Sequence, residues 1–395
     1  MSIPAVFMRG GTSNAVVFKR GDLPEDRALW DDIFLAALGS PDPNGRQLDG
    51  MGGGISSLSK ICVVGPPSHP RADIDFTFAQ VSVHAAQVDY GGNCGNMTSA
   101  MAPFAVDEGM VQVSGDAATV IIHNTNTDKL VRARFALDEG RAAVDGDLAI
   151  PGVAGTGAPV RLEFLSPGGA SSGRLLPTGN VLDVLRVADI GDIDASLVDA
   201  SNACVFVDAA ALGLRGNEMP VALDADRELM DALERIRCAA GVAMGLGATV
   251  DEIRRERPSI PKLGLVAPPM SAVNLSGDAL RETDGDLTAR MISMGNTHRA
   301  LPLTGALCLA VAARIDGTLP NRHARAASDA RADLRIMQPS GTSVVGAGVE
   351  RRDGEWIAHQ ASVYRTQRRL FEGRVMIPAS RLGKGAVAAL SRRVA

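Results

Sequence analysis

Aromatic residues, long apolar runs and runs of one charge are scarce in this chain of 395 residues. Aromatic side chains make up 4% of it, with two Trp and two Tyr, so the cores must be built from aliphatic side chains and methionine. No stretch reaches the roughly 18 apolar residues that a membrane-spanning helix needs. The net charge is -5, without a basic stripe for nucleic acid, and MSIPAVFMRG at the start lacks the features of a secretory signal. We therefore expect a cytoplasmic protein that binds neither membrane nor nucleic acid.

The cysteines and histidines exclude further classes of site. The cysteines are odd in number and scattered, without a CxxC pair, at Cys62, Cys94, Cys204, Cys238 and Cys308. This pattern indicates reduced thiols rather than a disulfide framework or a zinc site. The histidines show no HxH or HExxH spacing, and the chain has no phosphate-binding loop or dinucleotide-binding glycine motif. The sequence therefore predicts no metal, nucleotide or other cofactor.

Glycine and proline are abundant, with 43 and 21 residues, and they favour an architecture rich in strands and turns. The length suggests two domains. Two polar loops, residues 90–96 and 293–305, each lead into a short helix that is apolar on nearly all sides, residues 97–105 and 306–315. Such a helix must be surrounded by protein. We therefore predict an α+β protein of two similar domains, each a barrel-like curved sheet around a central helix whose N-terminus attracts carboxylates.

Cys94 is the most specific candidate for chemistry. It stands in Asn93-Cys94-Gly95-Asn96, where the first of the two loops, residues 90–96, leads into a helix. A helix N-terminus stabilises a thiolate, which can accept or donate a proton at carbon. The alternative is a buried structural cysteine, since cysteine is among the most buried residue types. The other four cysteines lie in apolar segments, and we expect them in the cores.

Lys60 is the second candidate, in Ser59-Lys60-Ile61-Cys62-Val63. A lysine at the entry of an apolar strand is unusual because lysine is rarely buried. Burial and a neighbouring cation would lower its pKa and make it a usable base. The alternative is a lysine on an edge strand that points into solvent.

Several segments rich in Gly, Ser and Thr suit the binding of carboxylates through backbone N–H groups and hydroxyls. Each is weak evidence by itself because most glycine-rich turns are only turns. His298, just before the second apolar helix, would bind a substrate carboxylate or shuttle a proton, and a structural histidine is the alternative. The segments are residues 9–13, 52–57, 177–180 and 304–305.

Eight motifs together resemble the 2-methylaconitate cis-trans isomerase family, which includes 3-methylitaconate and 4-oxalomesaconate isomerases. They occur in order from about residue 3 to residue 380: MRGGTS, GSPDP with QLDGMGGG, SSLSK, FAQVSV, DYGGNCGN, LPTGN, Pro261-Lys262 and SMGNTHRA. The resemblance implies the diaminopimelate epimerase-like fold. It also implies domains at residues 1–185 and 186–374, with residues 375–395 returning to the first domain.

The resemblance further implies a cofactor-independent isomerase that shifts a proton and a C=C bond of a small unsaturated di- or tricarboxylic acid, such as 2-methylaconitate, aconitate or 4-oxalomesaconate. Lys60 and Cys94 would flank this acid as catalytic groups. The protein could also form a homodimer or a higher homo-oligomer, and the sequence does not decide its oligomeric state. The implied substrate-binding residues are Arg9, Gly10, Thr12, Ser13, Met51, Gly52, Ser56, Ser57, Asn93, Gly95, Asn96, Thr178, Gly179, Asn180, Lys262, His298, Thr304 and Gly305.

Two departures from related patterns limit this interpretation. Racemases and epimerases of the fold use a second cysteine, which should fall near residues 303–305, whereas Cys308 lies one helical turn further and is expected to be buried. This argues against the rival interpretation, a proline or amino-acid racemase or epimerase. Asn14 stands where the family commonly has lysine, so the acid cannot be carried over directly. A non-catalytic protein that binds a small acid is the remaining alternative.

Overall fold

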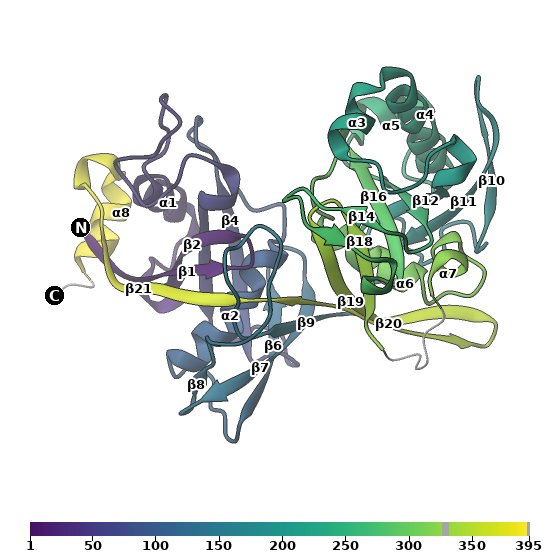
Figure 1. Ribbon diagram of the computed structural model, residues 1–395. Coiled ribbons are helices and arrows are strands. Elements are labelled where there is room, and N and C mark those ends of the chain that lie inside the picture. The colour runs from purple at the N-terminus through teal and green to yellow at the C-terminus, as the bar shows by residue number, and fades with distance from the viewer. Residues whose placement is uncertain (326–331, 393–395) are drawn as a thin grey trace. The chain divides into compact units, whose positions relative to one another are not determined.

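The computed structural model describes residues 1–325 and 332–392 (Figure 1). The chain forms two compact units. The first combines Met1–Leu162 with Tyr364–Ala395, and the second is Glu163–Val363. Within the described residues, no helix has the length and apolar character that crossing a membrane requires.

The sheet of the first unit is built around β1 (Ser2–Gly10). This strand pairs antiparallel with β2 (Ser13–Lys19) on one side and with β21 (Gln367–Met376) on the other. Beyond β2 the strands alternate between parallel and antiparallel pairing. In spatial order they are β3 (Lys60–Gly65), β4 (Ile74–Val81), β6 (Ala117–Asn124) and β7 (Lys129–Asp138).

Helix α2 (Gly95–Asp107) is the central helix of this unit. Every residue from Met97 to Val106 is buried, because the segment is apolar or small on all sides. The helix contacts β1, β2, β3, β4, β6, β7, β8 and β21. The predicted central helix at residues 97–105 is thus confirmed, and it begins two residues earlier, directly after Cys94.

The second unit repeats this order of pairing. Its strands β11 and β12 are antiparallel, β13 is parallel to β12, β16 is antiparallel to β13, β18 is parallel to β16, and β19 is antiparallel to β18. The central helix is α6 (Leu303–Ala312), which lies between β16 and β18 in sequence as α2 lies between β4 and β6. The prediction of two similar domains around central helices is therefore confirmed. The bounds are β11 (Gly191–Asp199), β12 (Ala203–Asp208), β13 (Lys262–Ala267), β16 (Leu287–Ser293), β18 (Leu334–Gln338) and β19 (Gly341–Arg352).

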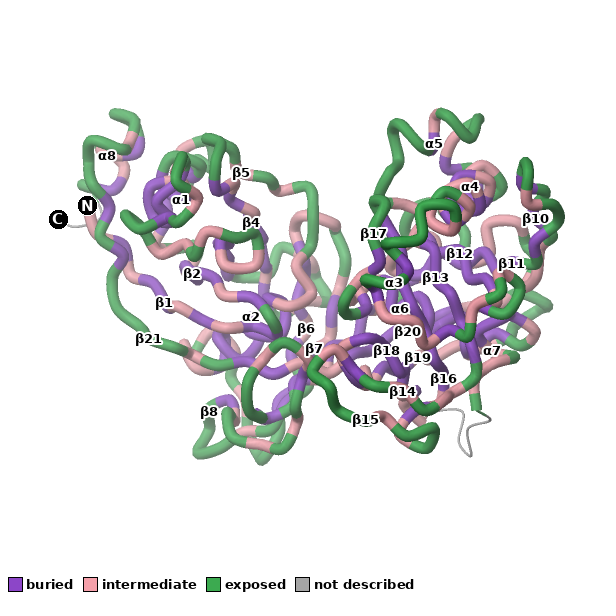
Figure 2. Tube along the Cα trace, turned by 45° about the horizontal axis from the view of Figure 1, so that its top comes forward, coloured by how far each residue is buried: buried purple, intermediate pink, exposed green. Residues whose placement is uncertain are grey.

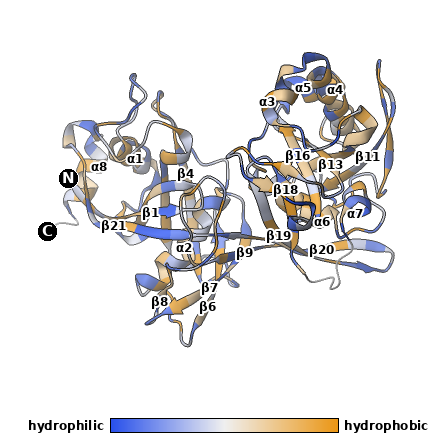
Figure 3. Ribbon diagram, viewed as in Figure 1, coloured by the Kyte–Doolittle hydropathy of each residue, from blue (hydrophilic) through white to orange (hydrophobic). Residues whose placement is uncertain are grey.

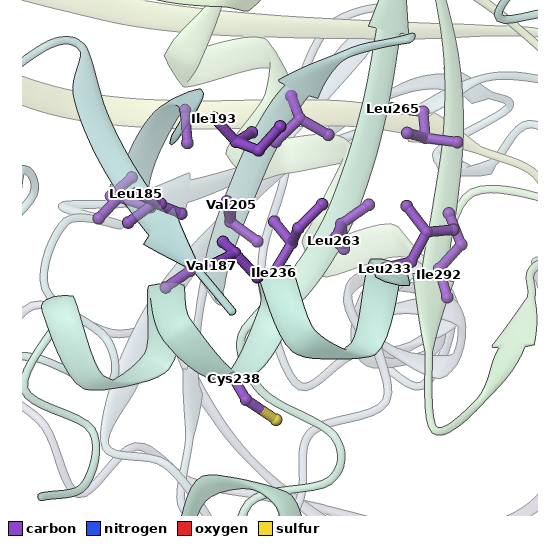
Figure 4. Packing of buried hydrophobic residues seen from close by; sticks show 14 of the residues in the cluster. Leu185, Val187, Ile193, Val205, Leu233, Ile236, Cys238, Leu263, Leu265 and Ile292 are labelled. Atoms are coloured by element: carbon purple, nitrogen blue, oxygen red, sulfur yellow. The ribbon is translucent and has the colours of Figure 1, made fainter. Parts of the chain in front are cut away.

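The remaining elements cover these sheets or extend them. Leu233 and Ile236 of α4 pack against Val205, Leu263 and Ile292 in the core of the second unit (Figure 4). Strands β12 and β13 are buried along their length and largely hydrophobic (Figures 2 and 3). The other bounds are α1 (Trp30–Leu38), α3 (Pro220–Ala225), α4 (Arg227–Ala243), α5 (Val250–Glu256), α7 (Leu319–His323), α8 (Lys384–Ser391), β5 (Val88–Asp89), β8 (Arg141–Ala142), β9 (Val160–Leu165), β10 (Asp183–Val187), β14 (Ala272–Val273), β15 (Ala279–Leu280), β17 (Asn296–Thr297) and β20 (Glu355–Arg365).

The boundaries of the units differ from the expected residues 185 and 375. The loop after β9 belongs to the second unit because the carboxylate of Asp199, at the end of β11, accepts hydrogen bonds from the backbone N–H groups of Ser171 and Ser172 at 2.7 and 2.6 Å. At the other boundary, all of β21 pairs with β1, from Ser2 opposite Met376 to Gly10 opposite Gln367. The returning segment therefore begins well before residue 375.

Candidate functional site

Several strand ends of the first unit meet at one edge of its sheet. The end of β1 lies beside the start of β2, because the two strands are antiparallel. Strand β3 is parallel to β2 and antiparallel to β4, so its start lies beside the start of β2 and the end of β4. Gly10 pairs with Gln367, which brings the start of β21 to the same edge. Arg9, Lys60 and the residues before Gln367 are thereby gathered from distant parts of the chain.

Lys60 is the first residue of β3 and is 8% exposed. Its ammonium donates a hydrogen bond to the side-chain carbonyl of Gln80 on β4, and it lies 5.0 Å from the centre of the Phe78 ring. Gln80 is fixed in turn, because its amide nitrogen donates to the backbone carbonyls of Ser56 and Ser59 at 3.1 and 2.9 Å. Lys60 is therefore a buried lysine held by neutral groups and does not point into solvent.

Cys94 is the N-cap residue of α2. It is partly exposed, whereas Cys62, Cys204, Cys238 and Cys308 are buried, as expected of core cysteines. The Cys94 side chain forms no capping hydrogen bond with the first turn of the helix. The N–H groups of its first turn and the helix dipole therefore favour an anion there.

The side chains around Cys94 connect it to the rest of the site. The Asn93 side-chain oxygen accepts a hydrogen bond from Nδ2 of Asn124 at 2.9 Å, which anchors the loop before the helix. The buried thiol of Cys62 lies near both candidate catalytic groups. Burial and then Cys94 raise the pKa of Cys62, and the charge of Lys60 opposes them. The structure thus places Lys60 and Cys94 near the same buried thiol of the first unit.

The turn between β1 and β2 packs directly on the first turn of α2. A Cβ on Gly10 would lie 2.6 Å from the Asn96 carbonyl oxygen, so this position requires glycine. Thr12 Oγ1 accepts a hydrogen bond from Asn96 Nδ2 at 3.0 Å. Ser13 is buried as the first residue of β2. The structure therefore brings this predicted segment together with Gly95 and Asn96 of the helix.

Arg9 lies near the end of β1, at the same edge of the sheet. Its Nη1 donates to the carbonyl of Gly11 at 3.0 Å and to the hydroxyl of Thr366 at 2.9 Å. Burial and then the charge of Arg368 lower the pKa of Arg9. A cation in such surroundings gains from the approach of a carboxylate.

Arg365 also belongs to this site, and the sequence did not reveal it. Its Nε donates to Asn96 Oδ1 at 3.1 Å and its Nη1 to the carbonyl of Tyr364 at 2.8 Å. The segment Tyr364-Arg365-Thr366 carries no motif, and its partner is 269 residues away. Only the pairing of β21 with β1 reveals the position of this arginine.

Four other predicted residues lie before Lys60 in the chain. The backbone N–H groups of Met51 and Gly52 donate to the carbonyls of Ala37 and Leu38 in α1, at 2.9 and 3.2 Å, so they are already occupied. Ser56 and Ser57 form a short 3₁₀ turn (Ser56–Leu58) directly before β3. The structure thus places the two serines just before Lys60, whereas the N–H groups of Met51 and Gly52 tie their loop to α1.

The second unit carries a related cluster. Lys262 begins β13 as Lys60 begins β3. Burial lowers the pKa of Lys262, whose Nζ donates to the carbonyl of Ser259 at 3.2 Å. His298 Nε2 and Ser293 Oγ are hydrogen-bonded at 2.7 Å. Burial and then the charge of Lys262 lower the pKa of His298, which favours the neutral imidazole.

The remaining predicted residues of the second unit fall into two places. Thr304 and Gly305 lie in the first turn of α6, whose N-cap residue, Pro302, makes no capping hydrogen bond through its side chain. Thr178 Oγ1 and Asn180 Nδ2 both donate to the carboxylate of Asp183, each at 2.8 Å, and Gly179 forms the turn between them. The polar groups of this turn therefore already bind a carboxylate of the chain itself.

No group of three His, Cys, Asp or Glu side chains within residues 1–325 and 332–392 is arranged to hold a metal ion. Nor does Arg9, Lys60 or Arg365 form an ion pair with a carboxylate in that part of the chain. The site of the first unit is therefore a set of cations around a free helix N-terminus, which is suited to an acid with several carboxylates.

The sequence matches the family described as PrpF protein over residues 1–378. A 3-methylitaconate isomerase of Eubacterium barkeri is 41% identical over 383 residues, which cover 97% of this chain and 99% of the relative. A 2-methyl-aconitate isomerase of Shewanella oneidensis is 36% identical, with 96% and 97% covered. The crystal structure of a methylitaconate-delta-isomerase has a TM-score of 0.91 at 41% identity, with 97% of each chain covered. The likeness thus extends over nearly the whole chain.

Proposed function

Because this chain belongs to the PrpF protein family, we propose that it is an isomerase which moves a proton, and with it a C=C bond, in a small unsaturated di- or tricarboxylic acid. One observation carries the assignment of the chemistry. A buried lysine, Lys60, is held by the neutral side chain of Gln80, and both Lys60 and Cys94, the N-cap residue of α2, lie near the thiol of Cys62.

The chemistry follows from these groups. Lys60, with its amine unprotonated, takes a proton from the carbon next to the double bond, so a C–H bond breaks and its electron pair spreads over the C=C bond into a carboxylate. The cations and the helix N-terminus stabilise the negative charge that develops. A new C–H bond then forms at the other end of the three-carbon system. The proton comes from the Lys60 ammonium or from the thiol of Cys94, and in the second case Lys60 returns a proton to the thiolate.

Proton NMR in D2O tests the function with a panel of acids: cis- and trans-aconitate, 2-methylaconitate, itaconate derivatives and 4-oxalomesaconate. We expect deuterium at the allylic carbon and a shifted or inverted double bond for at least one of them. An acid that binds and raises the melting temperature without exchange or isomerisation would support a non-catalytic acid-binding protein instead.

Substitution of Lys60 tests the assignment of the base. We expect Lys60→Met to lower kcat by about 10²- to 10⁴-fold, the range that general bases contribute, while acid binding remains measurable. Lys129→Met, at the exposed start of β7, is the matched control and should leave kcat unchanged. Turnover at the wild-type rate in Lys60→Met would remove Lys60 from the mechanism. Near-normal turnover in Cys94→Ser would give Cys94 a role in shaping the site only.

A further inference from the structure

Arg365 stands at the end of β20, directly before β21, and lies against the first turn of α2. Its Nε donates to Asn96 Oδ1 at 3.1 Å. Gly11, at φ +51°, passes so closely that a Cβ there would be 3.2 Å from Arg365 Cδ. The guanidinium is therefore positioned by the β1–β2 turn on one side and by the helix N-terminus on the other.

The guanidinium has unused donors. Of its five N–H groups, one binds Asn96 and one the carbonyl of Tyr364. Among the residues that the structure describes, no carboxylate pairs with it. Burial lowers the pKa of Arg365 to about 10. Partial burial of a cation that has free N–H donors and no carboxylate partner costs free energy unless an anion binds to it.

Other arginines of the same unit show the contrast. Arg369, four residues further on β21, pairs with Glu108 at 2.8 Å and with Glu372. Arg365 and Arg9 lie at the edge of the sheet where the strand of Lys60 begins, and neither has such a partner in residues 1–325 and 332–392. The uncompensated positive charge is thus concentrated at the candidate site.

We propose that Arg365 binds a carboxylate of the substrate at the N-terminus of α2 and is a specificity-determining residue. The inference rests on the proposed function and deepens it. Arg365 would select acids that carry a carboxylate besides the one that takes up the developing charge near Lys60. Two parallel N–H donors suit a carboxylate better than a single ammonium.

The test combines substitutions with amides of the acid. The acid of the NMR panel that wild-type protein binds best is prepared as mono-amides, with each carboxylate converted in turn. Affinity is measured by calorimetry for wild type, Arg365→Gln, Arg365→Lys and the control Arg71→Gln. Arg71 lies on an exposed loop of the same unit. Near-UV circular dichroism checks the fold of each variant.

Wild type should bind one particular mono-amide about 30- to 100-fold more weakly than the acid, as expected when one partner of a desolvated charge pair is removed. Arg365→Gln should bind that amide and the acid within about 3-fold of each other and keep the wild-type preference against the other amides. Arg71→Gln should behave as wild type. Arg365→Lys should show an intermediate preference for the acid over that amide. It replaces Arg365→Gln as the test variant if Arg365→Gln does not fold.

Other results overturn the inference. If Arg365→Gln or, should it not fold, Arg365→Lys keeps every wild-type preference, Arg365 has only a structural role. A wild-type protein that binds none of the acids overturns it as well. Because binding does not require turnover, a wild-type protein that binds acids without converting them refutes the proposed function alone, and the amide comparison still decides the role of Arg365.

Discussion

At the scale of single residues, His123 on β6 shows how one side chain couples stability to pH. Its Nδ1 lies 2.8 Å from Asp75 Oδ1 and its Nε2 lies 2.9 Å from Asp128 Oδ1. Burial alone would lower the pKa of His123, but hydrogen bonds to the two carboxylates outweigh it and raise the pKa. A raised pKa means that the folded state favours the charged form. The stabilisation is fully present below the unfolded value of about 6.5 and is lost as pH rises through the folded value.

We therefore expect His123→Gln to lower the free energy of unfolding by about 1 to 2 kcal/mol near pH 6 and by clearly less near pH 9. Urea unfolding at the two pH values measures the difference. His359→Gln is the control, because His359 is half-exposed and forms an ion pair with Glu350. An equal loss for His123→Gln at both pH values would contradict the role of the charged form.

The sequence marks single residues as candidates for chemistry better than it predicts their partners. Cys94 and Lys60 stand out because their neighbours in the chain mark a helix start and an apolar strand. Arg365 does not stand out, because its role depends on Asn96, a residue 269 positions away. The neutral partner of Lys60, Gln80, also comes from another strand. Such contacts depend on strand register, which the composition of one segment does not determine.

At the scale of elements, the loop from α1 to β3 is organised by Gln47. This side chain is fully buried. Its Nε2 donates to the hydroxyls of Ser40 and Ser59, each at 2.8 Å, and its Oε1 accepts from the N–H of Gly54 at 3.0 Å. The glutamine thus holds the loop against the residue before Lys60. The cluster of glycines in this loop, residues 50–54, predicts a turn but not the buried glutamine that fixes it.

We expect Gln47→Ala to lower the free energy of unfolding by about 2 to 4 kcal/mol, because two buried hydrogen bonds and one partly buried hydrogen bond lose their partner. Chemical denaturation measures this change. Gln112→Ala is the control, since Gln112 is exposed and makes one long hydrogen bond of 3.4 Å. If the loop also positions Lys60, kcat of Gln47→Ala should fall more than KM changes. Unchanged stability would show that water replaces the glutamine.

At the scale of the whole molecule, the repeated loop-and-helix pattern was sufficient to predict two similar domains around central helices. The boundaries were not predictable in the same way, because they depend on pairing between the two ends of the chain. The terminal amino group of Met1 donates to the carbonyl of Ile377 at 2.8 Å, and β1 pairs with all of β21. Ile3, Val375 and Ile377 share one core with α1. The first unit is thus completed by the last segment of the chain.

This topology predicts where a substitution near the C-terminus acts. Val375→Asp buries a charge, since Val375 is 8% exposed, and we expect it to destabilise the first unit by about 2 to 5 kcal/mol. Met376→Asp on the next residue, 74% exposed, is the matched control and should change stability by about 0.5 kcal/mol or less. Hydrogen exchange should show faster exchange in β1 to β4, with β12 and β13 unchanged, because their core contains no residue of β21. Equal loss of protection in both units would mean that they unfold as one cooperative body.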